Sequence, residues 1–260
     1  MFNKLSCVIS DRSALNILYK AVAVENKGIP QGLSISNILS SIYMKKLDEN
    51  YTSKLDISYY RYVDDILNLC NDSNINSVIK LIKKDTEKLK LTIHSFEDKN
   101  DKSLIGDISN DSFQYLGYEF YNNKLSVRKE SIKKFQERVI NIFTSSKKDK
   151  LSKLYENINL KITGCVYNNK QYGWMHFFGL IDDLELLYKL DWFIKKCFKQ
   201  FNRRYDEAKI KKFSKVYFQL KNFDINKYEK NSYIPNFDIN QDFRISYKKI
   251  KELKEDSIFY

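Results

Sequence analysis

The sequence is poor in the residues that interrupt regular structure, with two prolines and seven glycines among 260 residues. Flexible linkers and low-complexity segments are rich in these residues and in serine, so long segments of that kind are excluded. Because 43% of the residues are hydrophobic and 15% are aromatic, the chain can bury a sizeable core. The sequence therefore predicts one large folded domain or two smaller ones.

Cysteine and histidine are also scarce, which limits metal and disulfide chemistry. The four cysteines are scattered, no C-x-x-C motif is present, and neither of the two histidines lies near a cysteine at ligand spacing. Zinc sites need clustered ligands and small disulfide scaffolds need many cysteines, so neither is expected. Free thiols are typical of a reducing compartment, and we expect a cytoplasmic protein.

No apolar run reaches the length of a membrane span. The apolar N-terminus is interrupted by Asp11 and Arg12, so it is a poor signal peptide, and no membrane association is expected. Positive charge, by contrast, is abundant: the net charge is +12 and the pI is about 9.2. This balance favours polyanionic partners such as nucleic acid, although a lysine-rich composition alone does not decide the partner.

The apolar pattern divides the chain near residue 126. Before that point it predicts an α+β layer of helices, a hairpin and strands. The predicted helices are 11–24, a second from about 34, and 74–91; the hairpin is 57–70; the strands are 91–96, 104–108 and 113–121. Residues 127–215 read almost entirely as helices, in which Trp174 and Trp192 are expected to pack between helices. Residues 216–260 mix short extended pieces.

The segment YYRYVDDILNLC, residues 59–70, places Asp64 and Asp65 side by side at the predicted hairpin turn. Acidic residues favour turns for backbone reasons alone. Carboxylate oxygens are also the ligands that Mg²⁺ prefers, and a two-metal site for phosphoryl transfer needs a further carboxylate from a neighbouring strand. By itself the pair is either an ordinary acidic turn or half of a metal site.

The neighbouring motifs resemble those of reverse transcriptases, especially the bacterial ones. GIPQGLSISNILSSIYMKKLD (28–48) is similar to motif B of that family, YRYVDDILNL (60–69) to the Y-x-D-D box of motif C, and FQYLGYEF (113–120) to the primer-grip motif E. LSVRKESIKKFQERV (125–139) is similar to the start of the thumb in phage-defence-associated, retron-like members. The three motifs occur in the family's order and spacing.

The resemblance implies an RNA-directed DNA polymerase that adds deoxynucleotides to a primer 3′-hydroxyl with Mg²⁺. Asp64 is implied as a catalytic magnesium ligand and Asp65 as a supporting catalytic carboxylate and ligand. Substrate contacts are implied for Gly28, Pro30, Gln31, Gly32, Tyr62 and Val63. The primer grip is implied at Tyr115, Leu116 and Gly117.

The fold that the resemblance implies is α+β. Residues 1–126 correspond to the C-terminal part of a polymerase palm, an antiparallel sheet with packed helices. Residues 127–215 correspond to a helical thumb, and residues 216–260 to a C-terminal extension. The implied partners are RNA template, DNA primer or product, and dNTPs, together with a noncoding RNA or a second polypeptide that supplies fingers and motif A. The implied setting is bacterial antiphage defence.

The family's active site needs a further aspartate upstream of motif B, in motif A, and residues 1–27 are too few to hold it with the fingers. We therefore expect an N-terminally incomplete reverse transcriptase with little or no polymerase activity alone. Asp11 follows a strand-like run, but it is better explained as a helix cap. Two alternatives stay open: a non-catalytic nucleic-acid-binding remnant or scaffold, and a template-independent DNA-synthesising defence enzyme.

Overall fold

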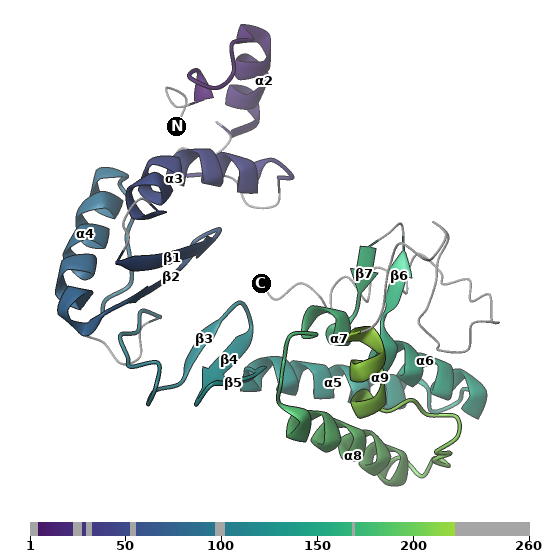
Figure 1. Cartoon of the computed structure of the whole chain (residues 1–260). Coiled ribbons are helices and arrows are strands. Elements are labelled where there is room, and N and C mark those ends of the chain that lie inside the picture. The colour runs from purple at the N-terminus through teal and green to yellow at the C-terminus, as the bar shows by residue number, and fades with distance from the viewer. Residues whose placement is uncertain are drawn as a thin grey trace. The chain divides into compact units, whose positions relative to one another are not determined.

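The computed structural model describes residues 5–22, 28–29, 33–52, 56–96, 102–167 and 170–221. The chain divides into two compact units, residues 1–105 and 106–260 (Figure 1). The predicted contact residues Pro30, Gln31 and Gly32 lie outside the described residues, as does most of the predicted C-terminal extension. Within the described ranges, no helix is long and apolar enough to span a membrane.

Two helices, α2 and α3, precede the first hairpin in the described part of the first unit. In α2 (Arg12–Val22) the Asp11 carboxylate accepts hydrogen bonds from the backbone N–H groups of Ser13, at 2.7 Å, and Ala14, at 3.2 Å. Asp11 is therefore a helix cap, as predicted. The next helix is α3 (Ser36–Thr52). A small core joins these segments through the buried side chains of Leu5, Val22 and Leu39.

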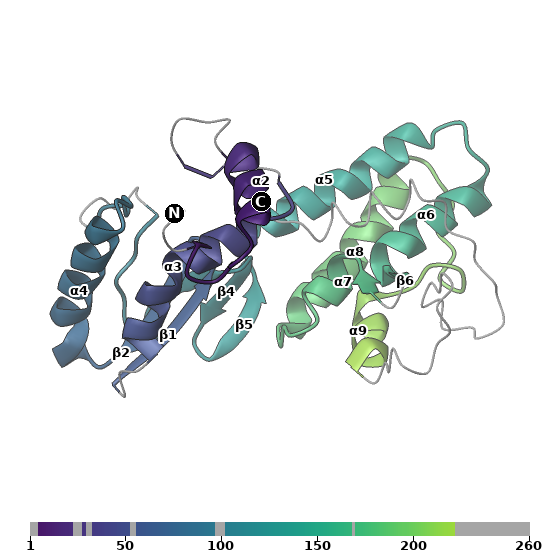
Figure 2. The ribbon, with the colours of Figure 1, turned by 90° about the horizontal axis from the view of Figure 1, so that it is seen from above.

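An antiparallel hairpin follows, formed by β1 (Ile57–Tyr62) and β2 (Asp65–Cys70). It leads through the 3-10 turn η1 (Asp72–Asn74) into α4 (Ile75–Lys88). One hairpin face packs with α3 and α4, as Figure 2 shows for α3 and β1. The shared core contains Met44, Leu47, Tyr51, Tyr59, Ile66 and Ile82. Residues along β1 alternate between half-buried and exposed, so on the opposite face of the hairpin the β1 side chains are exposed, whereas Leu67 and Leu69 of β2 are half-buried there.

The mixture of helices and antiparallel strands is compatible with the predicted polymerase palm, but two predicted strands are wrong. Residues 91–96 and 104–108 form no regular strand, and Leu104 and Ile108 are exposed. An apolar segment becomes a strand only where a neighbouring strand completes its hydrogen-bond ladder. The predicted strand 113–121 is a hairpin, because the chain reverses at Leu116 and Gly117.

That hairpin belongs to a three-stranded sheet of β3 (Phe113–Tyr115), β4 (Tyr118–Tyr121) and β5 (Lys124–Val127). Both of its turns have two residues with positive φ. Two-residue hairpin loops of this kind are type I′, whose twist matches that of the flanking strands.

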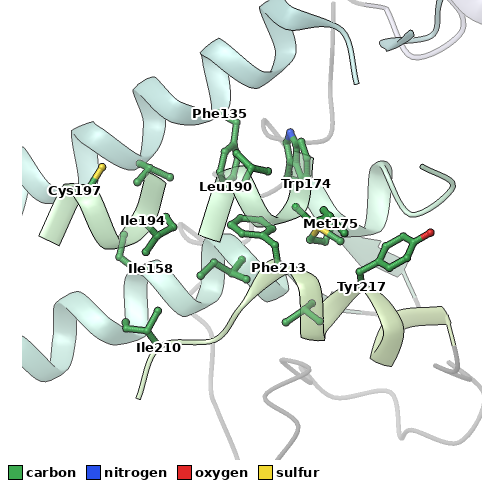
Figure 3. Packing of buried hydrophobic residues seen from close by; sticks show 14 of the residues in the cluster. Phe135, Ile158, Trp174, Met175, Leu190, Ile194, Cys197, Ile210, Phe213 and Tyr217 are labelled. Atoms are coloured by element: carbon green, nitrogen blue, oxygen red, sulfur yellow. The ribbon is translucent and has the colours of Figure 1, made fainter. Parts of the chain in front are cut away.

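The helical part of the second unit surrounds a large apolar core, shown in Figure 3. Its helices are α5 (Lys129–Ser145), α6 (Leu151–Thr163), α7 (Trp174–Phe177), α8 (Leu184–Gln200) and α9 (Phe213–Lys221). A short hairpin of β6 (Cys165–Tyr167) and β7 (Lys170–Tyr172), which the sequence did not predict, separates α6 from α7. Trp174 is 2% exposed in the core, as expected, whereas Trp192 is 63% exposed, so the prediction that it packs between helices is wrong.

Within the second unit, hydrogen bonds join the three-stranded sheet to the residues just before α8. Asp182 and Leu125 exchange hydrogen bonds: the Leu125 N–H donates to the Asp182 carboxylate at 2.8 Å, and the Asp182 N–H donates to the Leu125 carbonyl at 3.0 Å. The Ser126 hydroxyl donates to Asp183 at 2.7 Å, and Asp183 also accepts from the Leu186 N–H at the start of α8. These contacts lie within the second unit, which includes residues 113–127. The functional assignment of palm, thumb and extension remains a prediction.

Candidate functional site

The turn between β1 and β2 holds its backbone in an unfavourable conformation. Tyr62 and Asp65 are the last paired residues, which leaves Val63 and Asp64 as a two-residue loop. Val63 has a φ of 55°, and of the two loop residues only Val63 has a positive φ; positive φ values are typical of the primed turns that close tight hairpins. Glycine normally occupies that position, and a β-branched residue there costs on the order of 1–3 kcal/mol. The surrounding structure must hold this turn in place.

Both carboxylates lie at this turn. Asp64 is in the loop and Asp65 is the first residue of β2, and both are exposed. Residues paired directly across an antiparallel ladder share a face, so Asp65 lies on the same face of the hairpin as Tyr62, and both of these residues are exposed. The structure therefore brings together four of the predicted site residues: Tyr62, Val63, Asp64 and Asp65.

Arg61 stabilises the turn from the face of the hairpin that packs against α3. Its Nε and Nη2 donate to the two carboxylate oxygens of Asp48 on α3, at 2.7 and 2.5 Å. Its Nη1 donates to the backbone carbonyl of Val63 at 2.7 Å. The Tyr59 hydroxyl donates to the same Asp48 carboxylate at 2.7 Å. One guanidinium thus connects a helix to the strained residue of the turn through a bidentate ion pair.

The local environment keeps both partners charged. Burial alone would raise the pKa of Asp48, but hydrogen bonds from Arg61 and Tyr59 outweigh it and lower that pKa below its ordinary value. The hydrogen bond to Asp48 is the main cause that raises the pKa of Arg61. Because the Arg61 side chain is only 8% exposed, this pair is shielded from solvent on the guanidinium side.

Sequence reasoning missed Asp48 and Arg61, although a signal was present. Arg61 alternates with Tyr60 and Tyr62, so it falls on the strand face that carries the half-buried Tyr59. A charged residue on a packed face needs a partner of opposite charge. Asp48 ends the segment similar to motif B, but the sequence did not show that it lies beside Arg61.

The other described site residues that the sequence predicts belong to both units. Gly28 has a φ of 95°, a conformation that favours glycine, and nothing lies within 4 Å of where a Cβ would stand. Tyr115, Leu116 and Gly117 lie at the β3–β4 turn in the second unit. There Leu116 and Gly117 have φ values of 51° and 83°, which forms the tight tip of the predicted primer grip.

The carboxylates at the turn fit part of a magnesium site. Asp64 and Asp65 offer hard oxygen atoms, and Mg²⁺ commonly takes one or two carboxylates and completes its octahedron with water and substrate phosphates. Among the residues that the structure describes, no group of three or more His, Cys, Asp or Glu is arranged to hold a metal ion. That Asp64 and Asp65 would hold Mg²⁺ stays a prediction.

Residues 6–120 match the family model described as reverse transcriptase (RNA-dependent DNA polymerase). The match covers less than half of the 260 residues, and it begins upstream of α2 and ends within β4. It includes the segments similar to motifs B, C and E and extends the resemblance toward the N-terminus. Among curated proteins, none matches the chain.

The family match supports a reverse transcriptase, which is a nucleotidyltransferase. A domain of this family implies a nucleic acid template and primer and dNTP substrates, and the family generally uses divalent metal ions. The turn of Asp64 and Asp65 lies inside the matched range, whereas the helices α5 to α9 lie beyond it.

Proposed function

We propose that the chain is part of a bacterial, retron-like RNA-directed DNA polymerase that acts in the cytoplasm in antiphage defence. In this proposal Asp64 and Asp65 hold Mg²⁺ for nucleotidyl transfer to a primer 3′-hydroxyl. The observation that carries it is the pair of exposed carboxylates on a strained, braced turn inside a segment that matches the family model. The similarity of residues 125–139 to phage-defence-associated thumbs supports the finer assignment.

Bound Mg²⁺ would neutralise charge on the substrate phosphates, and phosphoryl transfer depends almost entirely on such neutralisation and on positioning. The residues of this chain supply the positioning. Asp64 and Asp65 orient the metal, while Tyr62 and Val63 contact the primer end. Arg61 keeps the turn in its conformation through the Val63 carbonyl.

The remaining predicted residues contact the substrates in this proposal. Gly28, Pro30, Gln31 and Gly32 contact the template and the incoming dNTP, and residues 115–117 grip the primer. Lysines on the helical unit follow the duplex backbone, as counterion release favours. They are all exposed, as this role requires: Lys133, Lys134, Lys147, Lys148, Lys195, Lys196 and Lys199.

A two-metal site needs a further carboxylate. We propose that a group outside the described residues supplies it, for example from a second polypeptide that also carries the fingers, and that a noncoding RNA accompanies the complex. The chain alone should then be much less active than the complex that forms in cells expressing its native locus.

The test is primer extension on an RNA template with dNTPs and Mg²⁺, using both the purified chain and the complex purified from such cells. We expect template-directed DNA from the complex, loss of at least about 10³-fold in kcat for Asp64→Asn, and no product when EDTA removes the metal. The control is Asp72→Asn, which removes another exposed carboxylate in η1 and should leave activity unchanged.

Two outcomes would overturn the proposal. Binding of primer–template without extension from either preparation would make the chain a non-catalytic nucleic-acid-binding protein. Product whose sequence does not follow the template would make it a template-independent polymerase.

A further inference from the structure

The outer surface of α8 carries two exposed aromatic side chains that line one pocket of about 460 Å³. Tyr188 is 61% exposed and Trp192 is 63% exposed. Phe218 of α9 also lines the pocket. Large aromatic side chains contribute most when buried, and an exposed apolar cluster of this kind marks a binding surface. The volume lies within the range of roughly 300–1,000 Å³ that is typical of ligand sites.

The fold holds this aromatic surface in a fixed position. Tyr188 and Trp192 are one helical turn apart and therefore lie on the same side of α8. The opposite side of α8 packs into the apolar core through Leu187 and through Leu190 and Ile194, the last two of which are labelled in Figure 3. Asp191, which also lines the pocket, accepts hydrogen bonds from the Phe213 N–H at 2.6 Å and the Ser214 hydroxyl at 2.7 Å. These bonds fix the start of α9 beside α8.

The charges around the pocket favour an anionic partner. Lys195 and Lys215 line it and are exposed, and the Lys196 ammonium lies 5.0 Å from the centre of the Trp192 ring. Both acidic residues in the lining are engaged within the unit, because Glu207 pairs with Lys212 and Asp191 accepts from the start of α9. Cationic side chains therefore lie beside exposed aromatic rings.

We propose that this pocket binds single-stranded nucleic acid, with bases stacked on Trp192 and Tyr188 and backbone phosphates beside Lys195 and Lys215. Aromatic rings combined with lysines are the surface that sequence-tolerant single-strand binding uses. An acidic peptide would pair with the lysines but offer no planar groups to the rings. A duplex keeps its base faces stacked inside, whereas a single strand exposes them.

This inference rests on the proposed function, because a polymerase that copies RNA handles single-stranded template. It places the contact on α8 and α9, beyond the segment that matches the family model. In this inference Lys195 contacts the template where it continues as a single strand beyond the primer–template duplex, and the other exposed lysines of the helices keep their place along the duplex.

The two tryptophans of the sequence give a site-specific signal, because Trp174 is buried and Trp192 is exposed. In the full chain, a 12-nucleotide oligouridylate should quench the emission of Trp192 as a base stacks on its ring. Trp192→Phe should lose the quenching but keep most of the affinity, since phenylalanine still offers a stacking face. The same quenching measurement with an oligodeoxythymidylate shows whether the pocket distinguishes RNA from DNA.

Affinity is measured by fluorescence anisotropy of the labelled oligonucleotide. Trp192→Ala and Tyr188→Ala should each weaken binding about tenfold, in line with the loss of one stacked base. Lys195→Ala and Lys215→Ala should weaken it by a smaller factor and each reduce the salt slope by about 0.7. The matched control is Leu180→Ala, because Leu180 is 77% exposed and lies outside the pocket lining; it should bind like the wild type.

Three results would overturn the inference. Equal affinity for an abasic strand of the same length would show that only phosphates are bound. Equal quenching of Trp192 by a 12-residue polyglutamate would show a general anion surface. Unchanged affinity in both aromatic variants, with the thermal midpoint retained, would show that the bases bind elsewhere.

The failure of this inference and the failure of the proposed function can be told apart. If Trp192-dependent binding is found without primer extension, the proposed function fails and the pocket inference stands. If extension occurs without such binding, only the pocket inference fails.

Discussion

Arg61 and Asp48 form a bidentate ion pair across 13 residues of sequence, and the third donor of the same guanidinium holds the carbonyl of Val63. The pair connects α3, which begins in the segment similar to motif B, with the turn that carries Asp64 and Asp65. Arg61 therefore links α3 to the backbone of the residue that precedes the two carboxylates. The pair also supplies the restraint that the left-handed backbone of Val63 requires.

Replacing Arg61 by lysine should lower the catalytic rate more than substrate affinity. A lysine ammonium cannot make the bidentate pair and the Val63 hydrogen bond together. We expect Arg61→Lys to reduce kcat for primer extension about tenfold with little change in the KM for dNTP. It should also lower the free energy of unfolding of the first unit by about 1–2 kcal/mol, by loss of charge-assisted hydrogen bonds. Steady-state extension assays and urea unfolding measure the two effects.

A double-mutant cycle with Asp48→Asn separates this role from a general loss of stability. If the two residues act as one unit, the double variant should have nearly the same kcat as Arg61→Lys alone. Effects on kcat that simply multiply in the double variant would contradict the coupling. Lys45→Gln, which removes an exposed ion pair with Glu49 on the same helix, is the control and should change stability by less than about 0.5 kcal/mol.

The stability of the first unit should fall in acid because of Asp48. Its pKa is lowered in the folded state by the hydrogen bonds from Arg61 and Tyr59, which outweigh the opposing effect of burial. The unfolded chain therefore takes up a proton at a higher pH than the folded chain, and stability rises with pH in that range. The contribution is complete above the ordinary aspartate pKa of 3.8 and is lost as the pH falls through the lower folded value. Urea unfolding between pH 5 and about 2.5 should show a shallower decline for Asp48→Asn; an unchanged slope would argue against the ion pair.

As the pH falls, the second unit should begin to lose stability at a higher pH than the first unit does, because of His176. Burial lowers its pKa from 6.5 to about 4, so between these values the unfolded chain binds a proton that the folded chain does not. Stability is therefore greatest above pH 6.5 and decreases as the pH falls toward 4, by on the order of 3 kcal/mol. The His176→Gln variant, followed through the emission of the buried Trp174 in a Trp192→Phe background, should show a much weaker pH dependence over this range. The exposed His94 offers the control variant, His94→Gln, which should retain the wild-type dependence.

The β3–β4 turn gives a test of the predicted primer grip. Gly117 has a φ of 83°, and an added Cβ would lie 3.5 Å from the Phe178 ring, which is ordinary contact. Gly117→Ala should therefore cost about 1–2 kcal/mol from backbone conformation alone, and Gly117→Asn less, because asparagine tolerates the left-handed region. If this turn grips the primer, both variants should raise the KM for primer–template more than the KM for dNTP. Equal changes in the two KM values would argue against that role.

The elements whose signals are local were predictable from the sequence. The hairpin carrying Asp64 and Asp65 was predictable because strand alternation and turn residues lie within a dozen positions. The cap at Asp11 and the principal helices of both units follow from similarly short patterns. The carboxylate turn was also identified correctly, since a tight turn leaves its residues adjacent whatever surrounds it. Its metal-binding role remains a prediction.

Features that depend on contacts with residues distant in the sequence were decided only by the tertiary structure. Residues 91–96 and 104–108 have the apolar content of strands but form no regular strand, because a ladder requires a neighbour that composition does not specify. Trp174 and Trp192 look alike in sequence, yet the first fills the core and the second lines an open pocket, since only packing determines which side of a helix is covered. The sequence by itself determined that two carboxylates stand at one turn. The tertiary structure decided that Arg61 and Asp48 hold that turn, because their pairing depends on how α3 lies against β1.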